Sequence, residues 1–346
     1  MEKQIISKLL SWYATSKRDL PWRVLHKNNL PNPYFVFVSE YMLQQTTVST
    51  VKTRFKEFIK KWPTLEDLAK TTEPKILKFW SGLGYYSRAR NLLKAAKIID
   101  KNFNSKIPNK YDDLISLPGI GDYTAKAIMG IGYNASVMPL DANIDRMFAR
   151  IYALNKPLIK IKKQLLEKSK NFCSKQKASN LIQSFMDYGS LICTPRNPNC
   201  SICGIQKFCL AYKNNFQNKI PVKLKKQNIK PTKYTRAYVL INEKKEILVR
   251  IRSSKGMLAS MLEVPNDDWE EKKILLTKDK FIKKIKLKFK KKGSLLYHFS
   301  HFNLSAEIFY AEINKKNFPD QKWLNLSKYN SSQLPTVMKK IVNQAI

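Results

Sequence analysis

The feature that most constrains the fold is a glycine-rich turn followed at once by a helical pattern, within residues 116–154. Pro118, Gly119 and Gly121 form the turn, and apolar residues at helical spacing begin at Thr124. Glycine adopts positive φ cheaply and lets another backbone approach closely, so we predict a helix, a tight hairpin and a second helix. Backbone N–H groups there could hold a phosphate without any side chain. The turn alone is equally compatible with an ordinary helix–helix connection.

Asp141 stands directly before another apolar pattern of helical period, which runs through residues 144–151. Aspartate is a favoured helix N-cap, and a cap is its simplest interpretation. It follows a tyrosine of the hairpin, Tyr123, by 18 residues. A hairpin, a tyrosine and an aspartate at this spacing form a combination far less common than any of its parts.

Glu40 is the single carboxylate in a long apolar run that includes residues 35–38, Met42 and Leu43. Poor solvation raises the pKa of a carboxyl group because it disfavours the charged form. Such a group can hold a proton near neutral pH and act as a general acid. The alternative is a glutamate at the exposed edge of a buried helix.

The charge of the chain points to a polyanionic partner. Its 346 residues carry 64 Lys and Arg against 26 Asp and Glu, a formal net charge of +38, which favours nucleic acid. A biased genome composition is the alternative, because Lys, Asn and Ile are common throughout. The length predicts two domains. No apolar run is long enough for a membrane helix, and the first residues resemble an amphipathic helix rather than a signal peptide, so we expect a soluble intracellular protein.

Four of the five cysteines lie within seventeen residues, with the spacing C-x6-C-x2-C-x5-C. In a reducing compartment this clustering indicates a metal site rather than disulfides. Four thiolates at this spacing permit either structural zinc or an iron–sulfur cluster. The fifth cysteine, Cys173, is expected to be a packing residue. The set is Cys193, Cys200, Cys203 and Cys209.

The hydrophobic period changes along the chain. Residues 1–110 and 155–190 have helical patterns, and residues 214–233 have the composition of a linker. After the linker, residues 236–252 alternate as strand, turn and strand, and we predict further strands at 284–292 and 305–313 and a helix from Pro335.

Several motifs together resemble one family. SEYMLQQT at residues 39–46, the LPGIG hairpin and the CTPRNPNCSIC wording of the cysteine loop resemble the MutY-type adenine DNA glycosylases of the helix-hairpin-helix superfamily. The resemblance implies a mostly α glycosylase domain at residues 1–213, with its helix-hairpin-helix at about 113–130 and a 4Fe–4S loop at 193–209. It also implies a linker at 214–233 and an α+β Nudix-like domain at 234–346. This domain lacks the glycine-led helix with clustered glutamates that binds magnesium in Nudix hydrolases, so it is expected to recognise rather than hydrolyse.

The resemblance assigns roles to individual residues. A protonated Glu40 would act on adenine N7, and an ionised Asp141 would stabilise the sugar cation, with Tyr123 and Asn143 positioning these groups. Tyr123 stands where strand-cleaving relatives carry lysine, which implies a monofunctional enzyme. The adenine pocket is expected at Trp22, Arg23 and Gln183, DNA contacts at Gly119, Gly121, Gln45, Tyr85 and Arg88, and 8-oxoguanine recognition at Phe299, Ser300 and His301. A solvent-facing helical position is the alternative for Gln183.

The resemblance also implies a substrate: adenine paired with 8-oxoguanine or guanine in double-stranded DNA. We expect a monomer, without membrane attachment, in the bacterial cytoplasm and associated with the nucleoid. Three alternatives remain. They are a lyase of the endonuclease III type using Lys126, a non-catalytic DNA-binding iron–sulfur protein, and a nucleotide pyrophosphatase.

Overall fold

The computed structural model describes residues 1–173, 176–222, 230–253, 256–273, 275–285, 287–314, 321–331 and 334–346. Their contacts divide the chain into two units. The first combines Met1–Ile76 with Ser87–Lys225, and the second combines Leu77–Tyr86 with Lys226–Ile346. None of the helices in these ranges has the length and apolar character needed to cross a bilayer.

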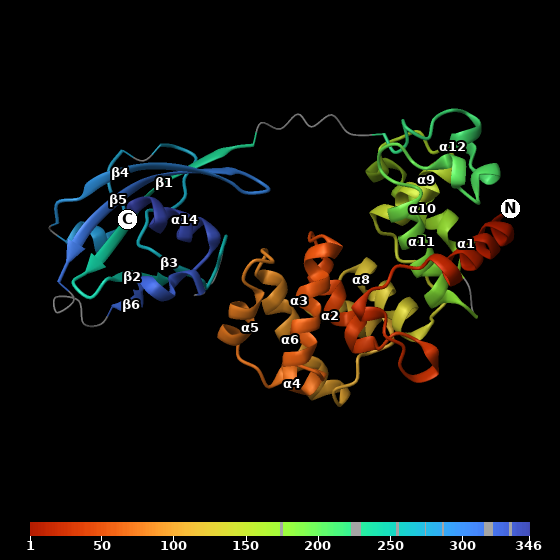
Figure 1. Cartoon of the computed structure of the whole chain (residues 1–346), viewed down its shortest axis with the longest axis horizontal. Coiled ribbons are helices and arrows are strands. Elements are labelled where there is room, and N and C mark those ends of the chain that lie inside the picture. Colours follow the sequence, from red (N-terminus) through yellow and green to blue (C-terminus); the bar gives the residue numbers. More distant parts are fainter. Residues whose placement is uncertain are drawn as a thin grey trace. The chain divides into compact units, whose positions relative to one another are not determined.

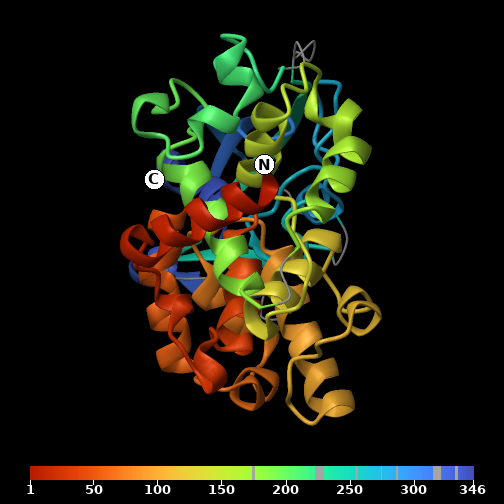
Figure 2. The same ribbon diagram turned by 90° about the vertical axis from the view of Figure 1, so that its right-hand side faces the viewer.

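The first unit is helical (Figure 1). Pro33 at the first helical position and the Asn32 side chain, which accepts a hydrogen bond from the Tyr34 N–H, begin the almost wholly buried helix α2. In Figure 2, α1 lies against α11, in agreement with their contacts. The helices of this unit are α1 (Glu2–Ser16), α2 (Pro33–Leu43), α3 (Val48–Lys61), α4 (Leu65–Ala69), α6 (Ser87–Phe103), α7 (Tyr111–Ile115), α8 (Asp122–Ala127), α9 (Ala142–Ile151), α10 (Leu158–Lys170), α11 (Ala178–Leu191) and α12 (Leu210–Lys213), whereas α5 (Glu73–Trp80) spans the division between units.

The glycine-rich turn joins α7 to α8, as predicted. Gly119 has a φ of +83°, and a Cβ there would lie 2.8 Å from the Cβ of Asn91 and 2.9 Å from the ring of Tyr41. Only glycine therefore fits this position without a shift of its neighbours. Gly121 differs, because its φ is −105° and a Cβ would meet nothing within 4 Å. The unusual backbone conformation belongs to the first of the two glycines.

The segment expected to be a linker is packed at its beginning. Ile220 is buried, and its carbonyl oxygen accepts a hydrogen bond from Nε of the buried Arg150 at 2.9 Å. At the other end, a strand already begins at Thr232. Residues 223–229 of this segment lie outside the described residues.

The second unit contains a mixed sheet with the strand order β3-β2-β1-β5-β4, and β6 pairs with β2. The central pair β1 and β5 is parallel, and the other pairs are antiparallel. Helix α14 (Thr336–Ala345) packs on one face (Figure 1) and α13 (Lys280–Lys284) contributes Ile282 to the cluster on the other. The strands are β1 (Thr232–Asn242), β2 (Glu246–Ile251), β3 (Leu262–Glu263), β4 (Lys290–His298), β5 (Asn303–Ile313) and β6 (Lys322–Asn325).

One predicted strand is wrong over most of its length. Residues 284–292 alternate like a strand, but the chain forms α13 up to Lys284 and enters β4 only at Lys290. The Asp279 side chain explains the helix, because it accepts hydrogen bonds from the N–H groups of Phe281 and Ile282. The short strands β3 and β6 carry too few residues for an alternating pattern to identify them.

Candidate active site

A cleft of about 410 Å³ opens in the helical unit, a size typical of small-molecule sites. Its walls come from α2, α8, α9 and α11 and from the segment after α1, so residues far apart in the sequence meet there. In Figure 1, α2 and α8 lie beside each other. Of the residues singled out in the sequence, the cleft brings together Trp22, Arg23, Glu40, Tyr123, Asp141, Asn143 and Gln183.

Glu40 lies in the second half of α2, and only 6% of its surface is exposed. An exposed helix edge is therefore excluded. Burial raises the pKa of Glu40 to about 7, a hydrogen bond with the side chain of Tyr123 lowers it, and the nearby charge of Asp141 raises it. The side chain is thus suited to hold a proton near neutral pH.

Asp141 is the N-cap of α9, as predicted. One carboxylate oxygen accepts from the N–H groups of Asn143 and Ile144, at 2.9 and 2.7 Å, and the other accepts from Asn143 Nδ2 at 2.8 Å. Burial raises the pKa of Asp141, while these hydrogen bonds and the charge of Arg146 oppose the rise. Three hydrogen-bond donors stabilise the carboxylate form of Asp141, whereas the carboxyl group of Glu40 has one such partner, the hydroxyl of Tyr123.

Arg146 fixes the orientation of Asn143 and was not identified from the sequence. Its Nη2 donates to Asn143 Oδ1 at 3.0 Å and to the carbonyl of Gly189 at 2.5 Å, and its Nε donates to the carbonyl of Cys193 at 2.8 Å. Gly189 permits the close approach, because a Cβ there would lie 2.7 Å from the Cβ of Asn143. The sequence feature that could have identified Arg146 is its place beside the apolar positions of an amphipathic helix.

Trp22 and Arg23, the two residues of the N-terminal segment expected near adenine, have different surroundings in the structure. Trp22 is buried and packs edge-on against Phe55, with ring centroids 5.5 Å apart. Arg23 forms a bidentate pair with the fully buried carboxylate of Asp187, at 2.6 and 2.8 Å, and Arg18 Nε donates to the same carboxylate at 2.6 Å. Asp187, which sequence reasoning missed, therefore holds this wall of the cleft.

Gln183 lies inside α11 with 2% of its surface exposed, which excludes a solvent-facing position. Its Nε2 donates to the backbone and side-chain oxygens of Ser179, at 3.1 and 3.2 Å. Its Oε1 is buried and has no hydrogen-bond partner among the described residues. A buried acceptor without a donor is costly, and this one lines the cleft.

The side chains expected to enter DNA share a backbone feature. Gln45 and Tyr85 both have left-handed conformations, with φ of +55° and +45°, and both are exposed. Such conformations are unusual for residues other than glycine, and they occur at functional sites more often than elsewhere.

Arg88 does not fit its expected phosphate contact. Its side chain is 5% exposed, and Nη1 donates to the carbonyl oxygens of Met42 and Tyr41 at 2.6 and 3.2 Å. These carbonyls belong to the last turn of α2, where a cation is favourable. Arg88 therefore stabilises the end of the helix that carries Glu40.

Lys126, considered as a substitute nucleophile, is directed elsewhere. Its Nζ lies 2.7 Å from Asp122 Oδ1, one helical turn earlier in α8. Lys126 does not belong to the described residues that line the cleft.

The four clustered cysteines line one cavity next to α9, together with Met147 and Arg150. Arg150 Nη1 donates to the sulfur of Cys193 at 3.2 Å, and the hydroxyl of Tyr188 donates to the sulfur of Cys203 at 3.4 Å. Within the described ranges, no three His, Cys, Asp or Glu side chains are placed to hold a single metal ion. Soft sulfur ligands around a cavity, with hydrogen bonds directed at the sulfurs, fit an iron–sulfur cluster.

The expected 8-oxoguanine contacts lie in the turn between β4 and β5. Ser300 and His301 are exposed, whereas Phe299 is half-buried. The ring of Phe299 packs on Tyr297, Phe302 and Trp269, with centroids 4.8, 4.9 and 5.6 Å away. Phe299 is thus the anchor of this turn, and the other two residues form its tip.

Comparison with known protein families matches three parts of the chain. Residues 38–183 match the HhH-GPD superfamily of base excision DNA repair proteins. Residues 193–209 match the iron–sulfur binding domain of endonuclease III, and residues 236–344 match a NUDIX domain.

Two curated relatives each match nearly the whole chain. An adenine DNA glycosylase of Buchnera aphidicola subsp. Baizongia pistaciae is 35% identical, over 97% of this chain and 95% of that protein. The human adenine DNA glycosylase is 26% identical, over 96% of this chain and 72% of that protein. A solved thermostable thymine-DNA glycosylase has a TM-score of 0.55 at 29% identity, over 62% of this chain and 97% of its own. A non-covalent endonuclease III–DNA complex has a TM-score of 0.50 at 19% identity, over 63% of this chain and 99% of its own. This likeness supports the fold alone.

The helical fold, the hairpin and the two-carboxylate cleft define a helix-hairpin-helix DNA glycosylase with an iron–sulfur domain and a Nudix-like α+β domain. The predicted fold class is confirmed. At 35% identity over nearly its full length, the chain belongs to the adenine DNA glycosylase family of base excision repair enzymes. The cofactor of its iron–sulfur domain is a 4Fe–4S cluster.

Proposed function

We propose that this protein removes adenine paired with 8-oxoguanine or guanine in double-stranded DNA, by hydrolysis of the N-glycosidic bond, and leaves an abasic site with the strand intact. One observation carries the proposal. Two carboxyl groups share a buried cleft, and burial raises the pKa of both, but three hydrogen bonds oppose the rise at Asp141 whereas Glu40 has only the one with Tyr123. Such a pair can hold opposite protonation states, which glycosidic bond cleavage requires.

The reaction begins with adenine turned out of the stack into the cleft, at a cost that is lower for a mispaired base. Glu40 donates its proton to N7, which makes adenine a better leaving group. As the bond between C1′ and the base breaks, the carboxylate of Asp141 stabilises the positive charge that develops on the sugar. Water then adds to C1′, and the proton it releases returns to the Glu40 carboxylate, which leaves the abasic site. Tyr123 cannot form the Schiff base that strand cleavage needs, and Lys126 is paired with Asp122.

The remaining residues of the cleft position the base. Gln183 Oε1 accepts no hydrogen bond from the part of the chain that the structure describes, and the amino group of adenine supplies a donor. Trp22 offers an aromatic wall, and Arg23 is held in place by Asp187. Asn143 keeps Asp141 oriented.

We propose that the DNA duplex is held by backbone N–H groups at Gly119 and Gly121, with Gln45 and Tyr85 inserted between bases. Ser300 and His301 would contact 8-oxoguanine, with Phe299 as their anchor. The net charge of +38 supports binding to DNA, and the repulsion between copies of so basic a chain favours a monomer. We assign residues 1–213 to catalysis, 214–233 to the linker and 234–346 to recognition of the lesion.

We propose that Cys193, Cys200, Cys203 and Cys209 are the cluster ligands. When bound, the cluster supplies four metal–sulfur bonds that hold residues 193–209 together. Arg146 then joins this loop to the active site, because it donates to the carbonyl of Cys193 and to the side chain of Asn143.

Single-turnover assays on duplexes with adenine opposite 8-oxoguanine, guanine or thymine test the proposal. We expect excision in the order 8-oxoguanine, guanine, thymine, with strand breaks that appear only after alkali. Glu40→Gln and Asp141→Asn should each abolish most of the activity, whereas Glu57→Gln, at a half-exposed surface glutamate, should not. An adduct trapped by borohydride would contradict the monofunctional assignment, and full activity of Glu40→Gln would contradict the mechanism.

A further inference from the structure

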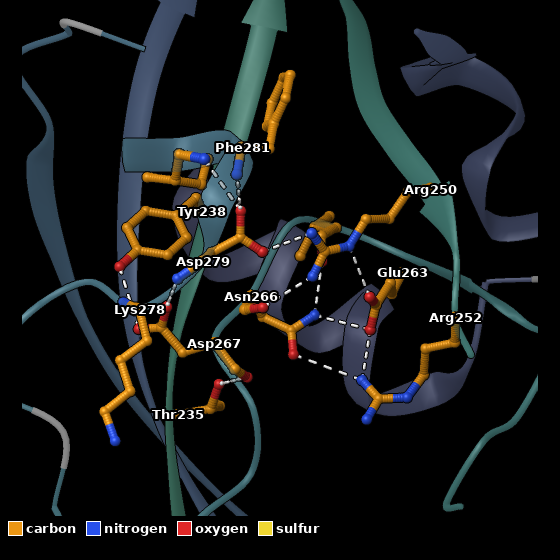
Figure 3. Close-up of polar contacts among 12 residues, drawn as sticks. Thr235, Tyr238, Arg250, Arg252, Glu263, Asn266, Asp267, Lys278, Asp279 and Phe281 are labelled. Atoms are coloured by element: carbon orange, nitrogen blue, oxygen red, sulfur yellow. Dashed lines mark hydrogen bonds and ion pairs between the residues drawn. The ribbon is translucent and has the colours of Figure 1, made fainter. Parts of the chain in front are cut away.

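The MLEVP motif, residues 261–265, contains a buried glutamate that the proposed chemistry does not use. Glu263 is 4% exposed. Its carboxylate accepts hydrogen bonds from Arg250 Nε at 2.7 Å, from Asn266 Nδ2 at 2.8 Å and from Arg252 Nη1. Figure 3 shows both arginines directed at Glu263, with Asn266 beside them. Because every charge in this group is paired, the group has a defined geometry.

This group holds the indole ring of Trp269 from two directions. The guanidinium carbon of Arg252 lies 4.5 Å from the ring centroid, a cation–π distance. The indole Nε1 donates to Asn266 Oδ1 at 3.1 Å. Arg252 and Asn266 are both bound to Glu263, so the glutamate fixes the face and the edge of the indole together.

Trp269 in turn packs against the turn between β4 and β5. Its ring centroid lies 5.6 Å from that of Phe299 and 6.1 Å from that of Phe302. The N–H of Phe299 donates to the carbonyl of Phe302 at 2.9 Å and closes the turn. A continuous set of contacts therefore runs from Glu263 through Arg252 and Trp269 to Phe299, while Ser300 and His301 remain exposed at the tip.

We propose that Arg252 and Trp269 are positioning residues for the turn 299–301, and that they set the preference for adenine opposite 8-oxoguanine over adenine opposite guanine. The inference rests on the proposed role of that turn in lesion recognition. 8-Oxoguanine differs from guanine by an O8 acceptor and an N7–H donor, so the turn gains selectivity only through hydrogen bonds that require accurate placement. A loosened turn loses these bonds with 8-oxoguanine and loses little with guanine.

The test uses the full chain with its cluster bound. Arg252→Gln removes the cation over Trp269 and leaves Glu263 paired with Arg250. Because Arg250 also pairs with Asp279, one cation then serves two carboxylates, so thermal unfolding of the variant is measured beside its activity. Trp269→Leu removes the indole ring, and Trp269→Phe is the conservative variant. The matched control is Arg236→Gln, because Arg236 makes a similar cation–π contact elsewhere in the same domain, 4.4 Å from the centroid of Phe309.

The main measurement is the ratio of single-turnover rate constants for adenine opposite 8-oxoguanine and opposite guanine. We expect Arg252→Gln to lower this ratio by about threefold to tenfold, the range of a partly buried cation–π contact. Trp269→Leu should lower it at least as much, and Trp269→Phe should restore most of it. Hydrogen exchange at the Phe299 amide should be faster in Arg252→Gln and unchanged in Arg236→Gln.

The other outcomes distinguish a failure of this inference from a failure of the proposed function. An unchanged ratio in Arg252→Gln and Trp269→Leu would overturn the inference, and so would an equal fall in Arg236→Gln, which would indicate general loosening of the domain. A wild-type protein that does not prefer 8-oxoguanine over guanine would instead overturn the proposed function of the turn. Wild-type selectivity that is lost in Ser300→Ala but kept in Arg252→Gln would support the proposed function and reject this inference.

Discussion

The pH dependence of adenine excision tests the placement of the proton on Glu40. Burial raises the pKa of Glu40 to about 7. If the reaction requires the protonated acid, the single-turnover rate constant has a plateau at lower pH. Above the pKa, it falls about tenfold for each pH unit. Glu40→Gln has no proton to lose, so this falling limb should disappear along with most of the activity.

Tyr123→Phe should move the falling limb in a defined direction. The hydrogen bond with Tyr123 lowers the pKa of Glu40 because it stabilises the carboxylate, so its removal raises the pKa. A hydrogen bond to a charged group is worth about 1.5–3 kcal/mol, and 1.36 kcal/mol corresponds to one pKa unit. The same hydroxyl also forms a hydrogen bond with the protonated acid, and the loss of that bond offsets part of the rise. We therefore expect the pKa of Glu40 to rise by about one unit, which moves the falling limb to about pH 8.

The same pKa predicts a change in stability that does not depend on catalysis. Between pH 4.5, the ordinary pKa, and about 7, the folded state binds more protons at Glu40 than the unfolded state does. The free energy of unfolding therefore falls as pH rises through this window, by about 3 kcal/mol in total at 1.36 kcal/mol per unit. Relative to wild type, Glu40→Gln should be more stabilised at pH 8 than at pH 5 in thermal unfolding.

The assay is rapid-quench single turnover between pH 5.5 and 9, on a duplex with adenine opposite 8-oxoguanine. Tyr133→Phe is the control, because the Tyr133 hydroxyl donates to the Ile107 carbonyl outside the cleft. Its falling limb should coincide with that of wild type. A wild-type profile that stays flat above pH 7, or a limb that moves to lower pH in Tyr123→Phe, would refute the assignment of Glu40 as the proton donor.

Three further predictions concern the neighbouring groups. Asp141→Asn should lower the excision rate constant by about 10²–10³-fold with unchanged duplex affinity in fluorescence anisotropy, because the lost charge acts in the transition state; weaker binding of equal size would contradict this role. Lys126→Ala should leave excision unchanged and, like wild type, give no borohydride-trapped adduct above background; an adduct that wild type forms and Lys126→Ala does not would restore the lyase alternative. Tyr188→Phe removes the hydroxyl that donates to the Cys203 sulfur at 3.4 Å. It should shift the reduction potential of the bound cluster to more negative values in voltammetry, and an unshifted potential would count against the hydrogen bond.

Several features of this protein are local and could be predicted from the sequence. The hairpin depends on a glycine at positive φ within a short turn, and the cap of α9 depends on Asp141 and the N–H groups just after it. The environment of Glu40 follows from its apolar neighbours along α2. The spacing of the cysteines limits them to one loop. In each case the physical cause lies within a few residues of its effect.

Other features depend on partners that are distant in the sequence. Arg88 has the sequence setting of a phosphate ligand, but the last carbonyls of α2 lie next to it in the fold. Arg146, Asp187 and Trp269 carry no motif, and their roles depend on hydrogen bonds and ring contacts with other elements. Spacing in a sequence determines which residues share a face of a helix or strand. Only tertiary packing decides which buried polar groups meet, because desolvation makes each of them depend on a specific partner.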